Sequence, residues 1–219
     1  MLPLTVVDNF FESPSYIRNY ALQQSFDKFG VHPGIRTKKL SEINQNMNKF
    51  ISDKIISLFF DLRKDRVYCN IDASFQITSE HYEEGWVHND DGGQDGPDFA
   101  GVIYLTPNAP LDTGTSIHRP NEKYNGLDHK LKDLFYADKE VDIEMYRNAR
   151  EENNSKFYKT LDISNVYNRL VVYNAQDFHK ENKFFGNTNN TSRMTLVFFG
   201  KFINNISTGI VRSRTISSY

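Results

Sequence analysis

The sequence predicts a mainly β protein with N-terminal helices, and three observations support this fold class. Apolar residues recur at helical spacing within the first 60 of the 219 residues. Extended runs with period-two alternation then follow one another from about residue 66 to residue 203. The 17 Phe and 12 Tyr indicate a core of rings packed on sheets, where aromatic residues are favoured. We therefore expect helices that cover a β-sheet core.

The N-terminal elements can be placed from turn signals and periodicity. A short strand is expected at residues 4–7, and a proline after Ser13 predicts a helix over residues 14–24. Residues 29–36 contain two glycines and a proline and are expected to form a loop. Apolar residues at three- and four-residue steps predict an amphipathic helix over residues 41–60. These residues are Ile43, Met47, Phe50, Ile51, Ile55, Leu58 and Phe59.

The β core follows as strands separated by polar turns. The first expected strand runs from residue 66 to near residue 88, and the others are residues 99–105, 115–119, 169–174, 178–180 and 193–199. Residues 121–165 have a higher charge density and no lasting period-two pattern, so helices and loops are expected there, for instance at 130–136 and 143–150. Beyond Asn204 the chain is rich in Ser and Thr, and we expect an edge strand or a loose end.

This order of elements predicts one domain over residues 1–219. A helical layer of residues 1–65 precedes a core of residues 66–203, which is interrupted once at about residues 121–165. No repeat or linker divides the chain. Six to eight antiparallel strands after a helical layer fit a two-sheet jelly roll best, the cupin-like double-stranded β-helix.

Composition excludes several classes of function. The formal net charge is −2 and the pI is about 6.3, so general phosphate binding to nucleic acid is not expected. Cys69 is the only cysteine, which excludes an intrachain disulfide and a cysteine-based zinc site and indicates a reducing compartment. The sequence contains no signal-peptide core and no apolar run of membrane-spanning length, so a soluble, cytoplasmic protein without membrane contacts is expected.

A His-x-Asp pair and one later histidine predict a metal site. His88 and Asp90 end an extended run, and side chains two residues apart in a strand share a face. His179 ends a later strand and precedes a loop. Two imidazoles and one carboxylate with the remaining coordination positions open are the ligand set of a non-haem Fe(II) centre that activates O₂. The predicted metal ligands are therefore His88, Asp90 and His179.

A co-substrate anchor is predicted fourteen residues after His179. Arg193 begins a strand, and Thr195 lies on the same face of that strand. The guanidinium fork of an arginine matches a carboxylate, and a neighbouring hydroxyl adds a donor. Arg193 and Thr195 are thus suited to hold the far carboxylate of a small acid. Lys183 is a rival anchor, although it follows the histidine too closely for a strand that must return.

These residues resemble the Fe(II)- and 2-oxoglutarate-dependent dioxygenase superfamily, most closely its prolyl-hydroxylase-like branch. The resemblance covers about residues 73–118 and 169–201, and the N-terminal third more loosely. There, residues 7–14 and 33–36 look like a functionally uncharacterised group within the superfamily. It implies a hydroxylase that uses Fe(II), 2-oxoglutarate and O₂ through the three predicted ligands. It also implies that Tyr104 helps Arg193 to hold the C5 carboxylate. The gap between His179 and Arg193 is longer than is usual in that superfamily.

Other residues near the motif have competing interpretations. Asp91 is an alternative to Asp90, although the period-two spacing favours Asp90. His118 is a candidate to contact the substrate or the iron because it lies near the end of a strand. Trp86 precedes the His-x-Asp pair and is read as wall or substrate contact. His81 is expected to point away from the metal, and His129 to lie in solvent.

The primary substrate is not determined by these residues. The resemblance slightly favours a peptide or amino-acid side chain, with small metabolites as an alternative. Two other functions are compatible with the same fold, because fold does not fix function. One is a jelly roll that only binds a ligand, and the other is a cupin-type metal-dependent isomerase or lyase.

Overall fold

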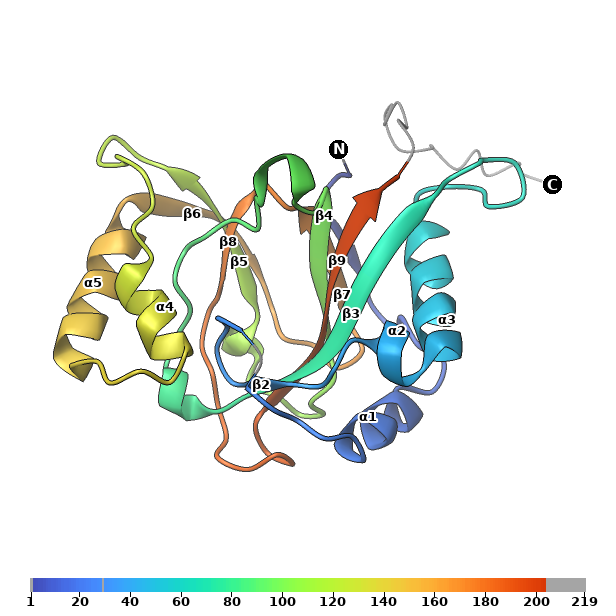
Figure 1. The fold of residues 1–219 in the computed structure, drawn as a ribbon, viewed down its shortest axis with the longest axis horizontal. Coiled ribbons are helices and arrows are strands. Elements are labelled where there is room, and N and C mark those ends of the chain that lie inside the picture. Colours follow the sequence, from blue (N-terminus) through green and yellow to red (C-terminus); the bar gives the residue numbers. More distant parts are fainter. Residues whose placement is uncertain (1, 29, 204–219) are drawn as a thin grey trace.

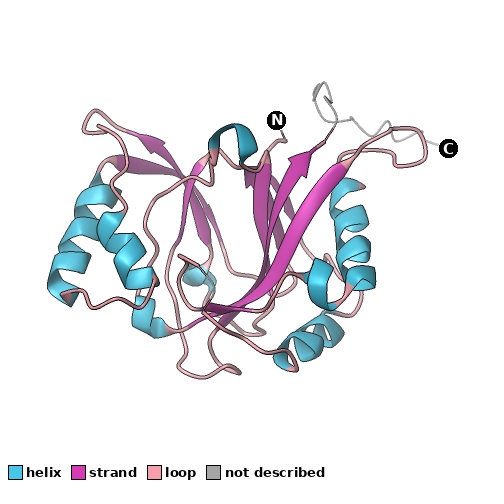
Figure 2. Ribbon diagram, viewed as in Figure 1, coloured by secondary structure: helices cyan, strands magenta, loops and turns pink. Residues whose placement is uncertain are grey.

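Strands occupy the centre of the molecule and helices lie on both sides of it (Figure 1 and Figure 2). The computed structural model describes residues 2–28 and 30–203. In the described part, the helices are α1 (Pro14–Leu22), α2 (Leu40–Ile43), α3 (Gln45–Ile56), α4 (Lys130–Tyr136) and α5 (Ile143–Ser155). None of the helices in residues 2–28 and 30–203 has the length and apolar character needed to cross a membrane.

The strands form two antiparallel sheets. They are β1 (Thr5–Val7), β2 (Ile35–Arg36), β3 (Cys69–Thr78), β4 (Phe99–Tyr104), β5 (Thr115–Pro120), β6 (Phe157–Ile163), β7 (Leu170–Asn174), β8 (Phe178–Glu181) and β9 (Arg193–Phe202). The larger sheet has the order β1-β7-β4-β9-β3-β2, and the smaller sheet has the order β6-β5-β8. Most neighbours are not consecutive in sequence, so the chain crosses repeatedly between the sheets.

The larger sheet has a buried core on each face. Its outer face packs against α1 and α3 through an apolar cluster that includes Phe75, Leu196 and Phe198. Its inner face meets the smaller sheet through Val102, Tyr104, Ile117, Val171, Tyr173 and Val197. Since successive residues of a strand face opposite sides, β4 and β7 are buried at every position.

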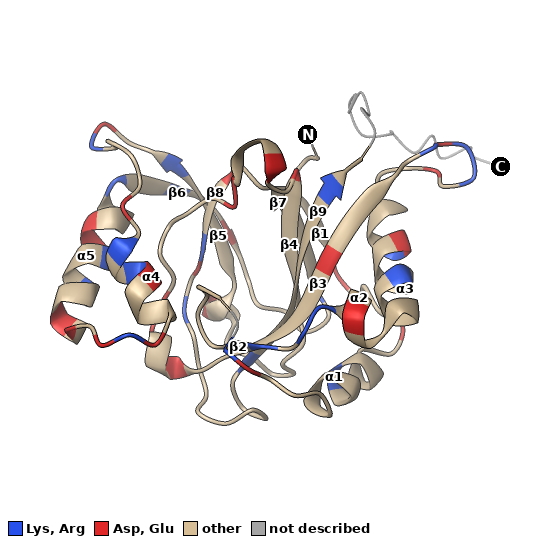
Figure 3. Ribbon diagram, in the orientation of Figure 1, with Lys and Arg blue, Asp and Glu red and all other residues tan. Residues whose placement is uncertain are grey.

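A third cluster lies beneath α4 and α5, beside the smaller sheet. It contains Tyr82, Trp86, Tyr136, Tyr146 and Phe184. Glu83 pairs with both Arg147 and Arg150 of α5, and Arg150 is almost fully buried. Positive and negative residues are interspersed along α3, α4 and α5 (Figure 3). The segment that leads to His88 is thus held by packing in this aromatic cluster and by the ion pairs between Glu83 and α5.

Several predicted elements are confirmed, and some need correction. The expected helices at 14–24, 130–136 and 143–150 are present as α1, α4 and α5, with α5 extending to Ser155. The helix expected over residues 41–60 is two helices, because Asn44 leaves the helical conformation. Its side chain accepts a hydrogen bond from the Met47 N–H at 3.0 Å and so caps α3. Within α3 the buried face consists of Met47, Ile51, Ile55 and Ile56, and Phe50 is 53% exposed because it lies beside this face.

One strand is shorter than expected, and two were missed by the sequence pattern. The strand expected to end near residue 88 stops at Thr78 as β3, and a turn follows it. β2 lies within the loop expected at residues 29–36, and it is only two residues long. β6 lies in the stretch expected to form helices and loops, where it pairs with β5. Its five central residues are all exposed, so it lacks the alternation by which strands are recognised. The strand or loose end expected beyond Asn204 lies outside the described residues.

Candidate functional site

Main-chain hydrogen bonds join the two histidine segments. The His88 N–H donates to the His179 carbonyl at 3.0 Å, and the His179 N–H donates to the His88 carbonyl at 2.8 Å. The Asp90 N–H donates to the carbonyl of Ala175, just after β7, at 2.8 Å. Residues 91 positions apart in sequence are therefore fixed side by side at the edge of the two sheets.

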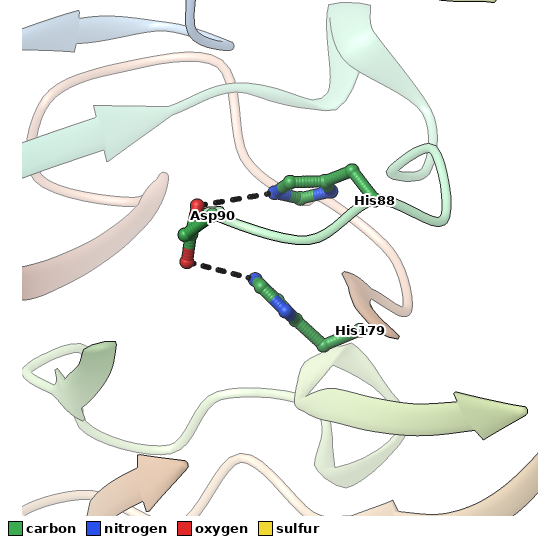
Figure 4. A group of neighbouring side chains, drawn as sticks. All are labelled: His88, Asp90 and His179. Carbon is green, nitrogen blue, oxygen red and sulfur yellow. Dashed lines mark ion pairs between the residues drawn. The ribbon is translucent and has the colours of Figure 1, made fainter. Parts of the chain in front are cut away.

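The side chains of His88, Asp90 and His179 converge on one point. His179 Nε2 lies 3.4 Å from Asp90 Oδ2, and His88 Nε2 lies 3.8 Å from Asp90 Oδ1. All three ligand atoms lie within 4.8 Å of one another, and Figure 4 shows both imidazole rings pointing toward Asp90. Atoms that each lie about 2 Å from one transition-metal ion are roughly 3 to 4 Å apart. The three residues thus have the spacing needed to share an ion.

Both histidines present a free nitrogen to this point. His88 Nδ1 lies 2.8 Å from the Trp86 carbonyl, and His179 Nδ1 lies 2.9 Å from the Asp177 carbonyl. If each Nδ1–H donates to its carbonyl, each Nε2 keeps its lone pair for a metal. Burial, together with the neighbouring His179, lowers the pKa of His88 to about 3. The imidazole of His88 is consequently neutral at physiological pH, which is the form that ligates metals.

The predicted anchor residues lie deeper between the sheets. Arg193 is 2% exposed, and its Nε donates to the Thr113 carbonyl at 3.1 Å. Its guanidinium lies over the ring of Tyr104 at 5.4 Å. The Tyr104 hydroxyl is 2.8 Å from Thr115 Oγ1, and Thr195 stands opposite Tyr104 across the sheet.

Two polar atoms of this group are buried without a partner. Among the described residues, Arg193 Nη2 and Thr195 Oγ1 have no hydrogen-bond partner. An unsatisfied buried donor costs about 1–3 kcal/mol, and more for a charged group. Such a cost is offset when a ligand supplies an acceptor, so these atoms fit a bound carboxylate.

The remaining candidates lie away from the three ligands. His118 faces the opposite side of β5 from its neighbour Ile117, whose side chain lies between the sheets, and its Nε2 is 2.8 Å from Ser116 Oγ. This alternation turns the ring of His118 away from the three ligands, and its contact with substrate or iron stays a prediction. Asp91 is exposed and caps a turn by accepting from the Gly93 N–H. Lys183 is exposed and pairs with Asp112 at 2.7 Å.

Trp86 belongs to the aromatic cluster and not to the cavity. It is 2% exposed and its ring packs on Tyr146 at 5.6 Å between centroids. It lies close to His129, which was expected in solvent but has a buried Nε2. The carbonyl of Trp86 is nevertheless the group beside Nδ1 of His88, one of the three candidate ligands. Trp86 therefore acts as the wall that holds His88.

The position of His118 gives a prediction for stability against pH. Burial, together with the positive charges of Lys180 and Lys159, lowers its pKa to about 4. The unfolded chain takes up this proton near pH 6.5 and the folded chain near pH 4, so the free energy of unfolding falls as pH drops through this window. The His118→Gln variant should show a shallower loss between pH 7 and pH 5 in urea titrations, by at most about 1.4 kcal/mol per pH unit. Identical slopes for the variant and the wild type would contradict this.

The structure also brings residues to the site that the sequence pattern did not single out. A cavity beside the three ligands is lined in addition by Arg36, Gln76, Thr115, Tyr173 and Glu181. Gln76 had a signal, since Ser74, Gln76 and Thr78 alternate with apolar residues in β3. A polar face of that kind normally faces solvent, but here Gln76 is 2% exposed and faces the interior.

Comparison with known proteins places the chain in a family. The model of DUF6445, described as a family of unknown function, matches residues 1–199. The chain belongs to the DUF6445 family. A search of curated proteins finds no significant match to this DUF6445 chain.

Solved structures share the fold of the DUF6445 chain at low sequence identity. HygX from Streptomyces hygroscopicus with nickel and 2-oxoglutarate bound has a TM-score of 0.56 and 11% identity, over 90% of this chain and 82% of HygX. A prolyl hydroxylase from Trichoplax adhaerens, in complex with a hypoxia-inducible-factor peptide fragment, has a TM-score of 0.52 and 12% identity, over 90% of this chain and 83% of that one. The shared feature is the fold.

Proposed function

We propose that this protein is an Fe(II)- and 2-oxoglutarate-dependent oxygenase that hydroxylates its substrate. The observation that supports it best is the convergence of His88, Asp90 and His179 with both imidazole Nε2 atoms free. In this proposal residues 1–219 are a single domain, and the two sheets are the halves of a double-stranded β-helix. We keep the expectation that it acts in the cytoplasm on a peptide, an amino acid or a small metabolite.

Structures of similar fold support the same chemistry. One HygX structure contains nickel and 2-oxoglutarate, and another, with a TM-score of 0.53 and 12% identity, contains hygromycin B as well. In the Trichoplax prolyl hydroxylase structure the bound partner is a peptide. In other proteins, therefore, the fold accommodates a metal with 2-oxoglutarate, a small molecule such as hygromycin B, or a peptide.

The residues present fit the proposed cofactors. His88, Asp90 and His179 would hold the metal on one side and leave its other positions open. When bound, Fe(II) together with 2-oxoglutarate and O₂ supplies the oxidising chemistry. The protein orients the reactants: carbonyls at Trp86 and Asp177 fix the two imidazoles.

The far end of the co-substrate has a matching group of donors. Arg193 Nη2 and Thr195 Oγ1 are both unpaired within residues 2–28 and 30–203, and both are buried. Tyr104 lies against the same guanidinium. A C5 carboxylate placed here would satisfy these donors in a region shielded from water, where charge-assisted hydrogen bonds are strong.

Turnover of 2-oxoglutarate tests the proposal. With Fe(II), ascorbate and O₂, the wild-type protein is expected to form succinate. The Arg193→Met variant should need a roughly 10- to 100-fold higher 2-oxoglutarate concentration, because a charge-assisted contact contributes about 1.5–3 kcal/mol. The matched control is Lys183→Met, which removes an exposed cation that pairs with Asp112.

The control also decides between the two anchors. Lys183→Met should leave the 2-oxoglutarate requirement unchanged. A loss with Lys183→Met and none with Arg193→Met would move the anchor to Lys183. The absence of both succinate formation and 2-oxoglutarate binding in the wild type would refute the oxygenase.

A further inference from the structure

The backbone of Arg36 is fixed by a glycine turn before it and by hydrogen-bonded partners on both sides. Gly34, two residues before it, has φ +73°, and a Cβ at that position would lie 2.0 Å from the Ile77 carbonyl oxygen. Only glycine allows this close turn against β3. Arg36 then pairs with Gln76 of β3 on one side. On the other side, its N–H and carbonyl exchange hydrogen bonds with Asp27, both at 2.9 Å.

The side chain of Arg36 is a cation without an acidic partner. Its Nε donates to Gln76 Oε1 at 3.0 Å, and its guanidinium lies 5.9 Å from the centre of the Phe199 ring. No carboxylate among residues 2–28 and 30–203 lies within 4.0 Å of it, and no hydrogen bond engages its two terminal nitrogens there. Burial lowers the pKa of Arg36 to about 10, against the effect of Glu181 and Asp90, so the group is charged at neutral pH.

Arg36 lies where two cavities adjoin. Together with Asp90, Val197 and Phe199 it lines the cavity at the three predicted metal ligands. The same four residues also line an open pocket of about 380 Å³. A molecule in the open pocket would thus reach the metal site beside Arg36, and the volume lies in the range of small-molecule sites.

The other cation of the open pocket is already neutralised. Lys39 pairs with Asp72 at 2.6 Å, and both residues line the pocket. Arg193 lines neither cavity. Arg36 is therefore a second, separate arginine that faces the route to the metal. A partly buried, unpaired guanidinium is costly unless an anion binds it, and its planar fork matches a carboxylate.

We propose that the open pocket is the primary-substrate site and that it takes a small molecule with a carboxylate, which Arg36 binds through its terminal nitrogens. This inference rests on the proposed oxygenase, because it names the substrate class of the same site. The apolar walls Pro97, Val197 and Phe199 contact the rest of the molecule. Arg36 and Arg193 then hold two different carboxylates, one from the substrate and one from the co-substrate.

Paired probes test the need for a carboxylate. The protein is loaded with Zn(II), which is diamagnetic and supports no turnover, and saturated with 2-oxoglutarate. Saturation-transfer difference NMR then measures the binding of N-acetylated aliphatic and aromatic amino acids, each as the free acid and as the primary amide. The free acids should bind the wild type at least about tenfold more tightly than their amides.

Variants assign this preference to Arg36. Arg36→Met should weaken binding of the acids roughly tenfold or more and leave the amides unchanged, while Arg36→Lys should retain part of the preference. Lys39→Met, which removes the paired cation of the same pocket, should keep the preference. Circular dichroism checks that each variant is folded.

Two results would overturn the inference. One is equal binding of acids and amides by the wild type. The other is that Arg36→Met weakens binding of 2-oxoglutarate itself while Arg193→Met does not, which would make Arg36 the co-substrate anchor. Failure of the oxygenase proposal would give a different result. The wild type would then bind the acids through Arg36 but form no succinate with Fe(II), and only the carboxylate-binding site would be supported.

Discussion

The His179→Ala variant is expected to lose metal binding and, with it, turnover of 2-oxoglutarate. His179 is 4% exposed, and its Nε2 lies 3.4 Å from Asp90 Oδ2. Removing even a hydrogen bond to a metal ligand typically costs about 10- to 100-fold in affinity, so loss of a direct ligand should cost more than about 100-fold. Anaerobic calorimetric titration with Ni(II) measures the affinity, and succinate formation with Fe(II) measures turnover.

The matched control replaces a histidine on the other face of the sheet. His118 is also buried, at 8% exposed, and its ring is held by Ser116 rather than by the metal-site residues. His118→Ala should keep Ni(II) affinity within about twofold of the wild type, since the coupling between sites without shared partners is usually small. Equal losses in the two variants would mean that general destabilisation, and not ligation, explains the result.

Much of the fold could be predicted because strong periodicity reflects burial. β3 and β9 were recognised from alternation, and each pairs along its length with a neighbour in the larger sheet. β6 was not recognised, because its central residues are all exposed, among them Lys159, Thr160 and Asp162. Without a buried face, a strand has no need for alternating polar and apolar residues. Phe50 is an apolar residue that is not buried, because it lies about 100° around α3 from Ile51 and so outside the face that packs on the sheet.

The candidate site also combines features that local sequence determines with features that depend on long-range pairing. His88 and Asp90 could be predicted to converge because period two is a local property of extended chain. Their approach to His179 was expected from the order of elements and depends on pairing that sequence alone does not specify. Arg36 could not be foreseen as a site residue, because its place at the cavity depends on a two-residue strand and on the contact between Gly34 and Ile77.

The Phe75→Ala variant is expected to lose about 3–5 kcal/mol of unfolding free energy, the range for deleting a buried phenylalanine. Phe75 is 0% exposed, stands opposite Leu196 across β3 and β9, and packs with Tyr20 of α1. The cavity would lie at the contact between the helical layer and the larger sheet. Urea denaturation followed by circular dichroism measures the loss.

A second phenylalanine of the same helix–sheet layer serves as the control. Phe50 of α3 is 53% exposed, so Phe50→Ala should change the unfolding free energy by less than about 1 kcal/mol.

Gln76, the neighbour of Phe75, faces the cavity, and its Oε1 accepts a hydrogen bond from Arg36 Nε. Because Phe75 and Gln76 are neighbours in β3, loss of the Phe75 ring should also displace Gln76. Phe75→Ala should therefore weaken carboxylate binding at Arg36 under conditions where the variant is still folded. Unchanged stability in Phe75→Ala would contradict the packing described for this layer, because a ring without solvent contact cannot be removed at no cost unless its neighbours fill the space.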